Sequence, residues 1–271
     1  MLNSNTTEAD LSRLFAYFKN LSRVALSFSG GVDSALLVAA GAQSIGSDNV
    51  HAFTVSSVLH AAGDADEAEG FCRALGVPFH RISADPLAVP AIRDNGTLRC
   101  YHCKRYMLER IREEAEAIGI PHVLEGTNAE EVRGYRPGVK ASAELGVLSP
   151  LKELGFSKAR VRAMAAALHI PQRDKPSSPC LATRIPYGDP LTEGALSRIA
   201  EGEKYLHSLG FSVCRLRHHG DLARIEVPPA DLPRVLSMRE QIAEALASFS
   251  YRFVTLDLLG YRQGCYDSAD D

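Results

Sequence analysis

The first half of the chain alternates between two hydrophobic patterns. Short runs of apolar, often β-branched residues alternate with longer stretches whose apolar positions recur at helical spacing. Strands are predicted at residues 24–28, 50–56, 78–83 and 122–126, and helices at 8–21, 35–40, 64–76 and 100–118. Because parallel strands need crossover helices between them, this order predicts an α/β fold, a doubly wound parallel sheet with helices on both faces.

The pattern changes in the second half of the chain. After an irregular basic stretch at 128–150, Ser157 is expected to cap a helix that ends at His169. A helix, two strands, a helix and a strand then follow at 192–209, 211–217, 222–227, 231–248 and 253–258. This order predicts a smaller α+β domain with its own sheet. We therefore expect a first domain at 1–187, and a domain for substrate binding or oligomerisation at 188–271.

Composition narrows the possible partners. The 271 residues are 45% hydrophobic and 23% charged, as in an ordinary globular protein, and the net charge of −3 disfavours a nucleic-acid partner. The sequence shows neither an apolar run long enough for a membrane span nor a signal peptide, so we expect no membrane association and a cytoplasmic location. Six cysteines are too few for a disulfide scaffold.

A glycine-rich loop, SGGVDS at residues 29–34, separates the first predicted strand from an apolar helix. Glycines permit positive φ angles and close approach of an anion, and the amides at a helix amino end favour negative charge. No lysine follows the glycines, so this is not the G-x-x-x-x-G-K-[ST] phosphate loop. The alternative is an ordinary turn in which Ser29 or Asp33 only caps the helix. Asp33 beside a polyanion would need a hard cation such as Mg²⁺, or else a capping role, and both stay open.

Two further segments should lie at the same edge of the sheet as this loop. Thr54 and Ser56 end the second predicted strand, and Gly126 and Thr127 follow the fourth. In open parallel sheets, ligands bind outside the carboxyl ends of the strands. The first pair would then form a wall for adenine, and the second a floor for ribose or substrate. Ordinary turn chemistry is the alternative for each pair.

Three cysteines lie in contexts that suggest chemistry. Cys100 and Cys103 form a C-x-x-C pair, which is half a metal site, a redox dithiol or two packed thiols. Zinc is disfavoured, because no second pair completes the four ligands. Cys180 lies in a proline-rich loop at 173–188.

Basic residues accompany Cys180 in that loop. They are Arg173, Lys175 and Arg184. If they surround Cys180 in space, they stabilise its thiolate, which is the reactive form. Most lone cysteines are instead inert and buried.

Arginines also recur on the predicted strands of the second domain. Strand alternation places Arg215 and Arg217 on one face, and Arg224 with Glu226 on one face of the next strand. Paired arginines at this spacing can grip a phosphate. A solvated sheet edge is the alternative.

In its strand and helix context, SGGVDS resembles the PP-loop of the N-type ATP pyrophosphatases, which split ATP between the α and β phosphates and activate a substrate as its adenylate. Further segments are RCYHCK at 99–104, RPG at 136–138, SPL at 149–151, PCLATRIPYG at 179–188, RIE at 224–226 and LDLLGYR at 256–262. Together with the loop, they resemble the LarE family along nearly the whole chain. Its members are ATP-dependent sacrificial sulfur transferases that help build the nickel-pincer nucleotide cofactor of lactate racemase. Many families share the PP-loop, whereas the PCLATRIPYG segment is specific to the LarE family.

The resemblance implies a PP-loop fold of the adenine-nucleotide alpha-hydrolase-like type and the use of ATP and Mg²⁺. It implies that a carboxylate of pyridinium-3,5-biscarboxylic acid mononucleotide is adenylylated, that the Cys180 sulfur attacks, and that the Cβ–S bond of Cys180 breaks to leave dehydroalanine. It also implies a homo-oligomer, a hexamer arranged as a trimer of dimers.

The motifs and the family resemblance together predict the residues of the site. The residues expected to bind ATP are Ser29, Gly30, Gly31, Asp33, Ser34, Thr54, Ser56, Gly126 and Thr127. Cys180 is the expected sulfur donor, and Arg215, Arg217 and Arg184 are expected to bind the substrate phosphate. The expected metal ligands are Asp33 and Glu203. Candidates for the base that removes the Cys180 Cα proton are Lys104, His102, His218 and a substrate phosphate.

Other functions stay open beside this one. Another PP-loop enzyme, either a tRNA thiolase that uses a persulfide or an amidotransferase, would share the loop. A thiolase should be basic, and an amidotransferase has no need of Cys180. Family members that hold an iron-sulfur cluster use several cysteines, whereas Cys180 has no cysteine neighbour in its loop. A nucleotide-binding regulatory module without catalysis is the alternative from another class.

Overall fold

The computed structural model describes residues 4–61, 63–131, 137–174 and 179–262. The chain divides into two compact units. The first unit consists of Met1–Ser57, Gly63–Ala84 and Cys100–Ser178, and the second of Val58–Ala62, Asp85–Arg99 and Pro179–Asp271.

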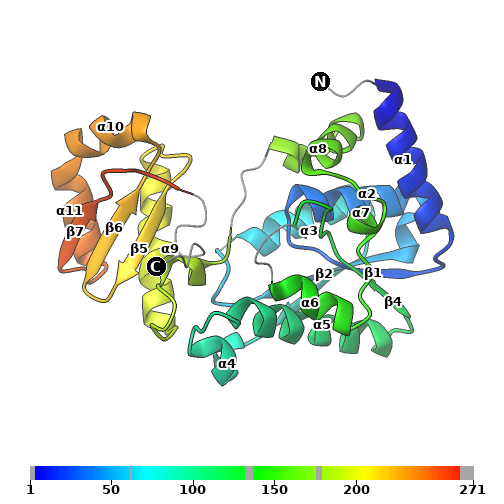
Figure 1. Ribbon diagram of the computed structural model, residues 1–271, viewed down its shortest axis with the longest axis horizontal. Coiled ribbons are helices and arrows are strands. Elements are labelled where there is room, and N and C mark those ends of the chain that lie inside the picture. Colours follow the sequence, from blue (N-terminus) through cyan, green and yellow to red (C-terminus); the bar gives the residue numbers. More distant parts are fainter. Residues whose placement is uncertain (1–3, 62, 132–136, 175–178, 263–271) are drawn as a thin grey trace. The chain divides into compact units, whose positions relative to one another are not determined.

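The first unit contains a parallel sheet of four strands, β1 (Val24–Ser27), β2 (Val50–Ser56), β3 (Phe79–Ser83) and β4 (His122–Leu124), in the order β3-β2-β1-β4. β1 therefore lies between β2 and β4 (Figure 1). Because strands added on either side of β1 reverse the winding direction, ligands are expected outside the carboxyl end of β1. The predicted α/β class and doubly wound sheet are confirmed.

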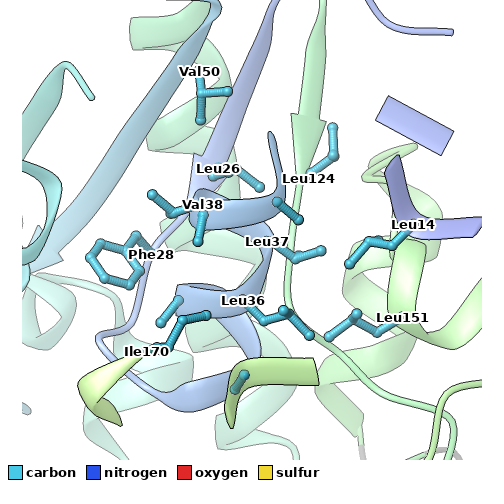
Figure 2. Close-up of a cluster of buried hydrophobic side chains, with 14 of the residues drawn as sticks. Leu14, Leu26, Phe28, Leu36, Leu37, Val38, Val50, Leu124, Leu151 and Ile170 are labelled. Carbon is cyan, nitrogen blue, oxygen red and sulfur yellow. The ribbon is translucent and has the colours of Figure 1, made fainter. Parts of the chain in front are cut away.

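Helices cover both faces of this sheet (Figure 1). They are α1 (Ser4–Lys19), α2 (Val32–Ile45), α3 (Asp64–Ala74), α5 (Arg99–Ala117), α6 (Pro137–Glu144), α7 (Pro150–Glu153) and α8 (Lys158–Ala167). Alternate residues of β1 point to opposite faces, so Leu26 packs in one core and Ala25 in the other. Figure 2 shows the larger core, in which Leu36 and Leu37 of α2 lie among side chains of α1, β1 and α7. The second core packs α5 against the other face through Leu108 and Ile111.

The stretch at 128–150 contains a helix that the periodicity did not predict. α6 begins at Pro137 and buries Ala141 and Ser142, and the segment then returns to the sheet, where Leu148 bridges to Leu124. A helix of eight residues is too short for a clear 3.6-residue period, so packing rather than local pattern stabilises it. The stretch expected to be irregular is therefore partly helical.

The second unit contains a three-stranded sheet, β5 (Arg215–His219), β6 (Leu222–Glu226) and β7 (Phe253–Leu256). β5 and β6 are antiparallel, and β6 and β7 are parallel. Its longer helices are α9 (Glu193–Ser208), α10 (Leu232–Ser237) and α11 (Arg239–Ser248), so the helix predicted at 231–248 is divided at Met238. Gly202 lets α9 approach the sheet closely, because a Cβ there would clash with the Leu216 side chain.

Residues 85–99 belong to this second unit and contain a short helix, α4 (Pro90–Arg93). Asn95 is buried at a positive φ of 54°, and its side-chain amide donates to the carbonyls of Pro186 (2.7 Å) and Asp189 (2.9 Å). These contacts tie the segment to the chain around 179–191. The units are therefore interleaved in sequence, which a single boundary at 187 does not describe.

Among the helices that the structure describes, none is long and apolar enough to cross a membrane.

A histidine pair links β2 and β3 of the parallel sheet, and Arg23, directly before β1, contacts it. His51 Nδ1 lies 2.9 Å from His80 Nε2, and Arg23 Nη2 lies 3.0 Å from His51 Nε2. Arginine can only donate, so His51 accepts at Nε2, carries its proton on Nδ1 and donates it to His80. Burial, with neighbouring His80 and Arg23, lowers the pKa of His51 despite a hydrogen bond to the Asp48 backbone, and burial lowers that of His80 despite Glu114.

We expect this pair to destabilise the fold in mild acid. Lowered folded-state pKa values mean that the pair contributes stability above the unfolded value of about 6.5, and that this contribution is lost as the pH falls through the folded-state values. Each protonation also removes an acceptor from a hydrogen bond worth about 1 kcal/mol. The measurement is the urea midpoint of wild type and His80→Gln between about pH 8 and pH 5. The variant should show the flatter profile.

His169→Asn serves as the control, because His169 is exposed and its φ of 55° suits asparagine. Its profile should follow wild type, and identical pH slopes in all three proteins would contradict the assignment.

Candidate active site

The SGGVDS loop connects the end of β1 to the start of α2, whose N-cap is Gly31. Gly30 has a positive φ of 72°, whereas Gly31 is extended at φ −84°. Only Gly30 thus needs glycine for its backbone angle. A Cβ on Gly31 would lie 3.6 Å from Ser29 Oγ, an ordinary contact, so the protein itself leaves room there. Gly126 packs beneath the loop, because its Cβ would lie 2.9 Å from the Ser34 amide nitrogen.

The two serines hold the shape of the loop. Ser34 is buried, and its hydroxyl donates to the Gly31 carbonyl (3.1 Å) and accepts from the Ser29 amide (3.3 Å). Ser29 Oγ lies 3.2 Å from Ser34 Oγ. The Ser34 hydroxyl therefore holds the backbone of the loop, whereas the Ser29 hydroxyl lies at the edge of the loop.

Asp33 contacts a lysine that is distant in sequence. Its Oδ2 forms an ion pair with Lys158, the first residue of α8, and its Oδ1 accepts from Asn128 Nδ2 at 3.3 Å. Lys158 is held there because Ser157 caps α8, accepting from the Arg160 amide. The fold thus supplies beside the loop the cation that its sequence lacks. No local pattern distinguishes Lys158 from the other basic residues of α8, Arg160 and Arg162.

The predicted rim residues lie where the sheet topology put them. Thr54 Oγ1 donates to the Phe28 carbonyl at 2.7 Å, next to the loop, and Ser56 ends β2. Thr127 is buried and donates to Glu125 Oε1 at 2.6 Å. Thr54 and Thr127 thus stabilise the rim through their hydroxyls.

Glu125, directly after β4, is a charged group that sequence reasoning missed. It is 1% exposed, forms an ion pair with Lys104 and accepts from Ser149 Oγ at 3.0 Å. Burial alone would raise the pKa of Glu125, but Lys104, Thr127 and Ser149 hold it below its usual range. Lys104, which is also a candidate base, is therefore a paired cation beneath the rim.

The donor set at Asp33 fits a magnesium ion that is shared with a polyphosphate. Mg²⁺ usually takes one or two carboxylates and keeps waters or phosphate oxygens as its other ligands. Asp33 has one such carboxylate, whose Oδ2 is paired with Lys158 in this structure. Among the described residues, no three His, Cys, Asp or Glu side chains are grouped to hold a metal by themselves.

Cys180 is the half-buried N-cap of a 3₁₀ turn, Leu181–Arg184. Cys72 and Cys214 are buried, and burial, together with nearby Glu69 and Glu203 respectively, raises the pKa of each thiol to about 12. Such thiols are poor nucleophiles near neutral pH.

The remaining cysteines are less informative. Cys100 and Cys103 lie in the first turn of α5 as thiols rather than as a disulfide, and Cys265 is outside the described residues. Lys175, expected near Cys180, is also outside them.

Three buried arginines donate to the backbone around Cys180. Arg99 Nη1 contacts the Ala182 carbonyl at 3.1 Å, and Arg217 Nη1 the Thr183 carbonyl at 2.6 Å. Arg184 Nη1 contacts the carbonyls of Pro179 (2.9 Å) and Cys180 (3.2 Å). Charged donors therefore contact four backbone carbonyls between Pro179 and Thr183.

Arg184 and Glu203 form a buried bidentate ion pair. Arg184 Nε and Nη2 each lie 2.8 Å from a carboxylate oxygen of Glu203, and Glu203 Oε1 also accepts from the Leu216 amide at 2.9 Å. Arg184 was expected on the substrate phosphate and Glu203 on a metal. In this structure the two side chains contact each other, Arg184 also donates to carbonyls beside and at Cys180, and Glu203 accepts from the Leu216 amide. This geometry favours a role in organising the chain around Cys180.

Arg215 and Arg217 lie on one face of β5, as predicted from strand alternation. The register pairs Arg215 with Glu226 and Arg217 with Arg224, so the same face holds three arginines. Arg217 is tied to Glu226 by an ion pair of 2.8 Å. Burial, with Arg184 nearby, lowers the pKa of Arg215, whose guanidinium stacks on the Tyr261 ring.

The sheet topology and the lysine-free glycine loop after the central strand place the first unit in the PP-loop class of ATP-using proteins. The family model for NAD synthase matches residues 15–118. A pyridinium-3,5-bisthiocarboxylic acid mononucleotide synthase from Lactiplantibacillus plantarum is 37% identical over 93% of this chain and 91% of its own length. The chain belongs to the family of this synthase, the LarE family.

Two other relatives match along most of their length. An uncharacterized protein from Synechocystis sp. is 35% identical over 95% of this chain and 96% of its own length. An uncharacterized protein from Methanocaldococcus jannaschii is 25% identical over 90% of this chain and 92% of its own length. The similarity thus extends through both units.

Proposed function

We propose that this chain is an ATP-dependent sulfur transferase of nickel-pincer nucleotide biosynthesis. Its substrate is pyridinium-3,5-biscarboxylic acid mononucleotide, one carboxylate of which it adenylylates before Cys180 donates sulfur. The observation that carries this proposal is the whole-length match to a synthase of the bisthiocarboxylic product. The test is the intact mass of the chain before and after one turnover, which should fall by the mass of hydrogen sulfide.

The first step needs a site that activates a carboxylate. A carboxylate is a poor acceptor, and joining it to AMP as a mixed anhydride provides a good leaving group. The carboxylate oxygen attacks the α phosphorus, and pyrophosphate leaves with the bridging oxygen. The amides after Gly30 bind phosphate oxygens, and Lys158, released from Asp33, neutralises the leaving pyrophosphate.

Asp33 is the proposed magnesium ligand in this step. When bound, Mg²⁺ would offset charge on the phosphates and orient them. Asp33 would hold the ion through the carboxylate that is paired with Lys158 in this structure.

The second step uses Cys180. Its thiolate attacks the acyl carbon and AMP leaves, which forms a thioester between Cys180 and the substrate. Breaking the Cβ–S bond then releases a thiocarboxylate and leaves dehydroalanine at position 180. The partial exposure of Cys180 supports this role, because buried Cys72 and Cys214 hold protonated thiols.

We propose that Arg215 binds the phosphate of the substrate, and we expect Arg215→Ala to weaken substrate binding while ATP binding stays nearly unchanged. A hydrogen bond to a charged group is worth about 1.5 to 3 kcal/mol. Separate titrations of the two ligands measure both affinities. Arg252→Ala, at an exposed position of the same unit, is the control and should bind both ligands normally.

Arg217→Ala is a poorer probe, since it would remove one of the two ion pairs of buried Glu226, whose other partner is Arg224, and cost stability as well. Equal loss of both affinities in Arg215→Ala would contradict a phosphate role.

The proposal includes a cytoplasmic enzyme with a small-molecule substrate and neither nucleic-acid nor membrane partners. Assembly into hexamers, as trimers of dimers, stays a prediction. A tRNA thiolase is the second candidate among PP-loop enzymes, and no observation favours it over the sulfur transferase.

A further inference from the structure

The backbone carbonyl of Cys180 receives three hydrogen-bond donors. The Thr183 amide lies at 3.1 Å, the Thr183 hydroxyl at 2.9 Å and Arg184 Nη1 at 3.2 Å. The amide contact is the usual bond of a 3₁₀ turn. The hydroxyl and the guanidinium are additional donors that the turn does not need. A carbonyl oxygen has two lone pairs, so three donors exceed its usual number of partners.

The cationic donor is fixed in place. Arg184 is 2% exposed, and its bidentate contact with Glu203 aims Nη1 at the turn. The same Nη1 donates to Thr183 Oγ1 at 2.8 Å and to the Pro179 carbonyl at 2.9 Å, so its two hydrogens are shared among three acceptors. The Thr183 hydroxyl in turn donates to the Cys180 carbonyl. This series of hydrogen bonds polarises the Thr183 hydroxyl and strengthens its hydrogen bond to the Cys180 carbonyl.

This oxygen matters for the release of sulfur, in an argument that rests on the proposed function. Cleavage of the Cβ–S bond begins when a base removes the Cα proton of the Cys180 thioester. The electron pair left on Cα is conjugated with the carbonyl of residue 180 itself, so negative charge develops on that oxygen. An amide carbonyl acidifies its neighbouring C–H only weakly, and fixed donors at the developing charge are the usual remedy in enzymes.

We propose that Thr183 and Arg184 form an oxyanion hole for the backbone carbonyl of Cys180. They stabilise the enolate formed when a Brønsted base takes the Cα proton. The enolate collapses to a Cα=Cβ double bond, the Cβ–S bond breaks, and sulfur leaves with the electron pair as the substrate thiocarboxylate. No oxidant or reductant is needed. Arg184 is thereby a catalytic residue of elimination rather than a ligand of the substrate phosphate.

A purely structural brace is the competing explanation. Arg99 permits a direct comparison, because it is buried like Arg184 and donates to the same segment, at the Ala182 carbonyl, without touching the reacting oxygen. A brace predicts the same effect from both arginines. An oxyanion hole predicts that only Arg184 and Thr183 affect the elimination.

The experiment is a single turnover with ATP, Mg²⁺ and the dicarboxylate mononucleotide, followed by intact mass. It separates the thioester adduct, heavier by the substrate less water, from the dehydroalanine product. In Arg184→Lys the adduct should form and its elimination should slow by about 100-fold or more, the usual effect of losing an oxyanion donor. Thr183→Val should slow elimination by about 10-fold, and Thr183→Ser should restore it. Arg99→Lys should eliminate near the wild-type rate.

Thr183→Val keeps the test decisive if Arg184→Lys does not fold, because Thr183 is only half buried. Thr255→Val is its control, since the Thr255 hydroxyl donates to a carbonyl elsewhere, that of Ala223. Elimination at the wild-type rate in Thr183→Val, or equal slowing in Arg99→Lys and Arg184→Lys, would overturn the proposal. Wild type that forms neither adduct nor dehydroalanine would instead refute the proposed function.

Discussion

Cys180→Ser is expected to release pyrophosphate from ATP when the dicarboxylate mononucleotide is added, and to transfer no sulfur. The groups proposed to activate the carboxylate belong to the other unit of the chain, so the substitution leaves them intact. A serine hydroxyl supplies no sulfur and is un-ionised near neutral pH. The result to measure is substrate-dependent pyrophosphate release together with the thiocarboxylate content of the product.

The same experiment on wild type reports the fate of the sulfur. The mass of the chain should fall by that of hydrogen sulfide, peptide mapping should find dehydroalanine at position 180, and turnover should stop near one sulfur per chain. Cys100→Ser and Cys103→Ser are the controls and should retain at least partial transfer, since the structure gives both residues as thiols on α5.

Two other outcomes would identify a different mechanism. A persulfide carrier would gain the mass of sulfur when loaded and later return to its starting mass. A cluster enzyme would contain iron and absorb visible light. Either result, with Cys180 chemically intact after turnover, would exclude the sacrificial reaction and leave the ATP site unaffected.

Gly31→Val and Asp33→Ala should each abolish ATP binding or adenylate formation while the protein stays folded. The Gly31 position has room for a Cβ in the protein itself, so a branched side chain there obstructs the phosphate rather than the fold. Asp33→Ala removes the proposed magnesium ligand and leaves Lys158 without its carboxylate partner. For Gly31→Val we expect at least about 100-fold weaker binding of ATP·Mg²⁺, since two or more hydrogen bonds between loop amides and phosphate, each worth about 1.5 to 3 kcal/mol, are lost.

Calorimetric titration with ATP·Mg²⁺ and a pyrophosphate-release assay measure these effects, and circular dichroism checks the fold. Gly70→Val, on α3, is the matched control because a Cβ there has no heavy atom within 4 Å. Normal pyrophosphate release by both loop variants would remove the loop from the nucleotide site.

Sequence periodicity predicted the sheet well, because the pattern of buried residues in each strand is local. The predicted bounds of β2 match the structure, and Ser157 caps α8 as expected from its position before the helix. Short α6 escaped prediction because its stability comes from burial of Ala141 and Ser142 against the rest of the unit.

Sequence pattern and family resemblance also located the two chemically distinctive segments, the SGGVDS loop and the stretch that contains Cys180. Glycine and cysteine in these contexts have specific backbone and chemical properties that remain visible in a linear string. The expected phosphate role of Arg184 was based on its position near Cys180 in the sequence. Sequence position does not show which groups the Arg184 guanidinium contacts.

The partners of these segments were decided by the tertiary structure alone. Lys158 meets Asp33 across 125 residues, and Arg184 meets Glu203 across 19, with no spacing rule that connects either pair. Ion pairs of this kind depend on where the sheet and its helices place two distant backbones and on how far burial excludes water. Local residue types therefore determined which chemistry this protein carries, whereas packing determined which charges assist it and which only organise the chain.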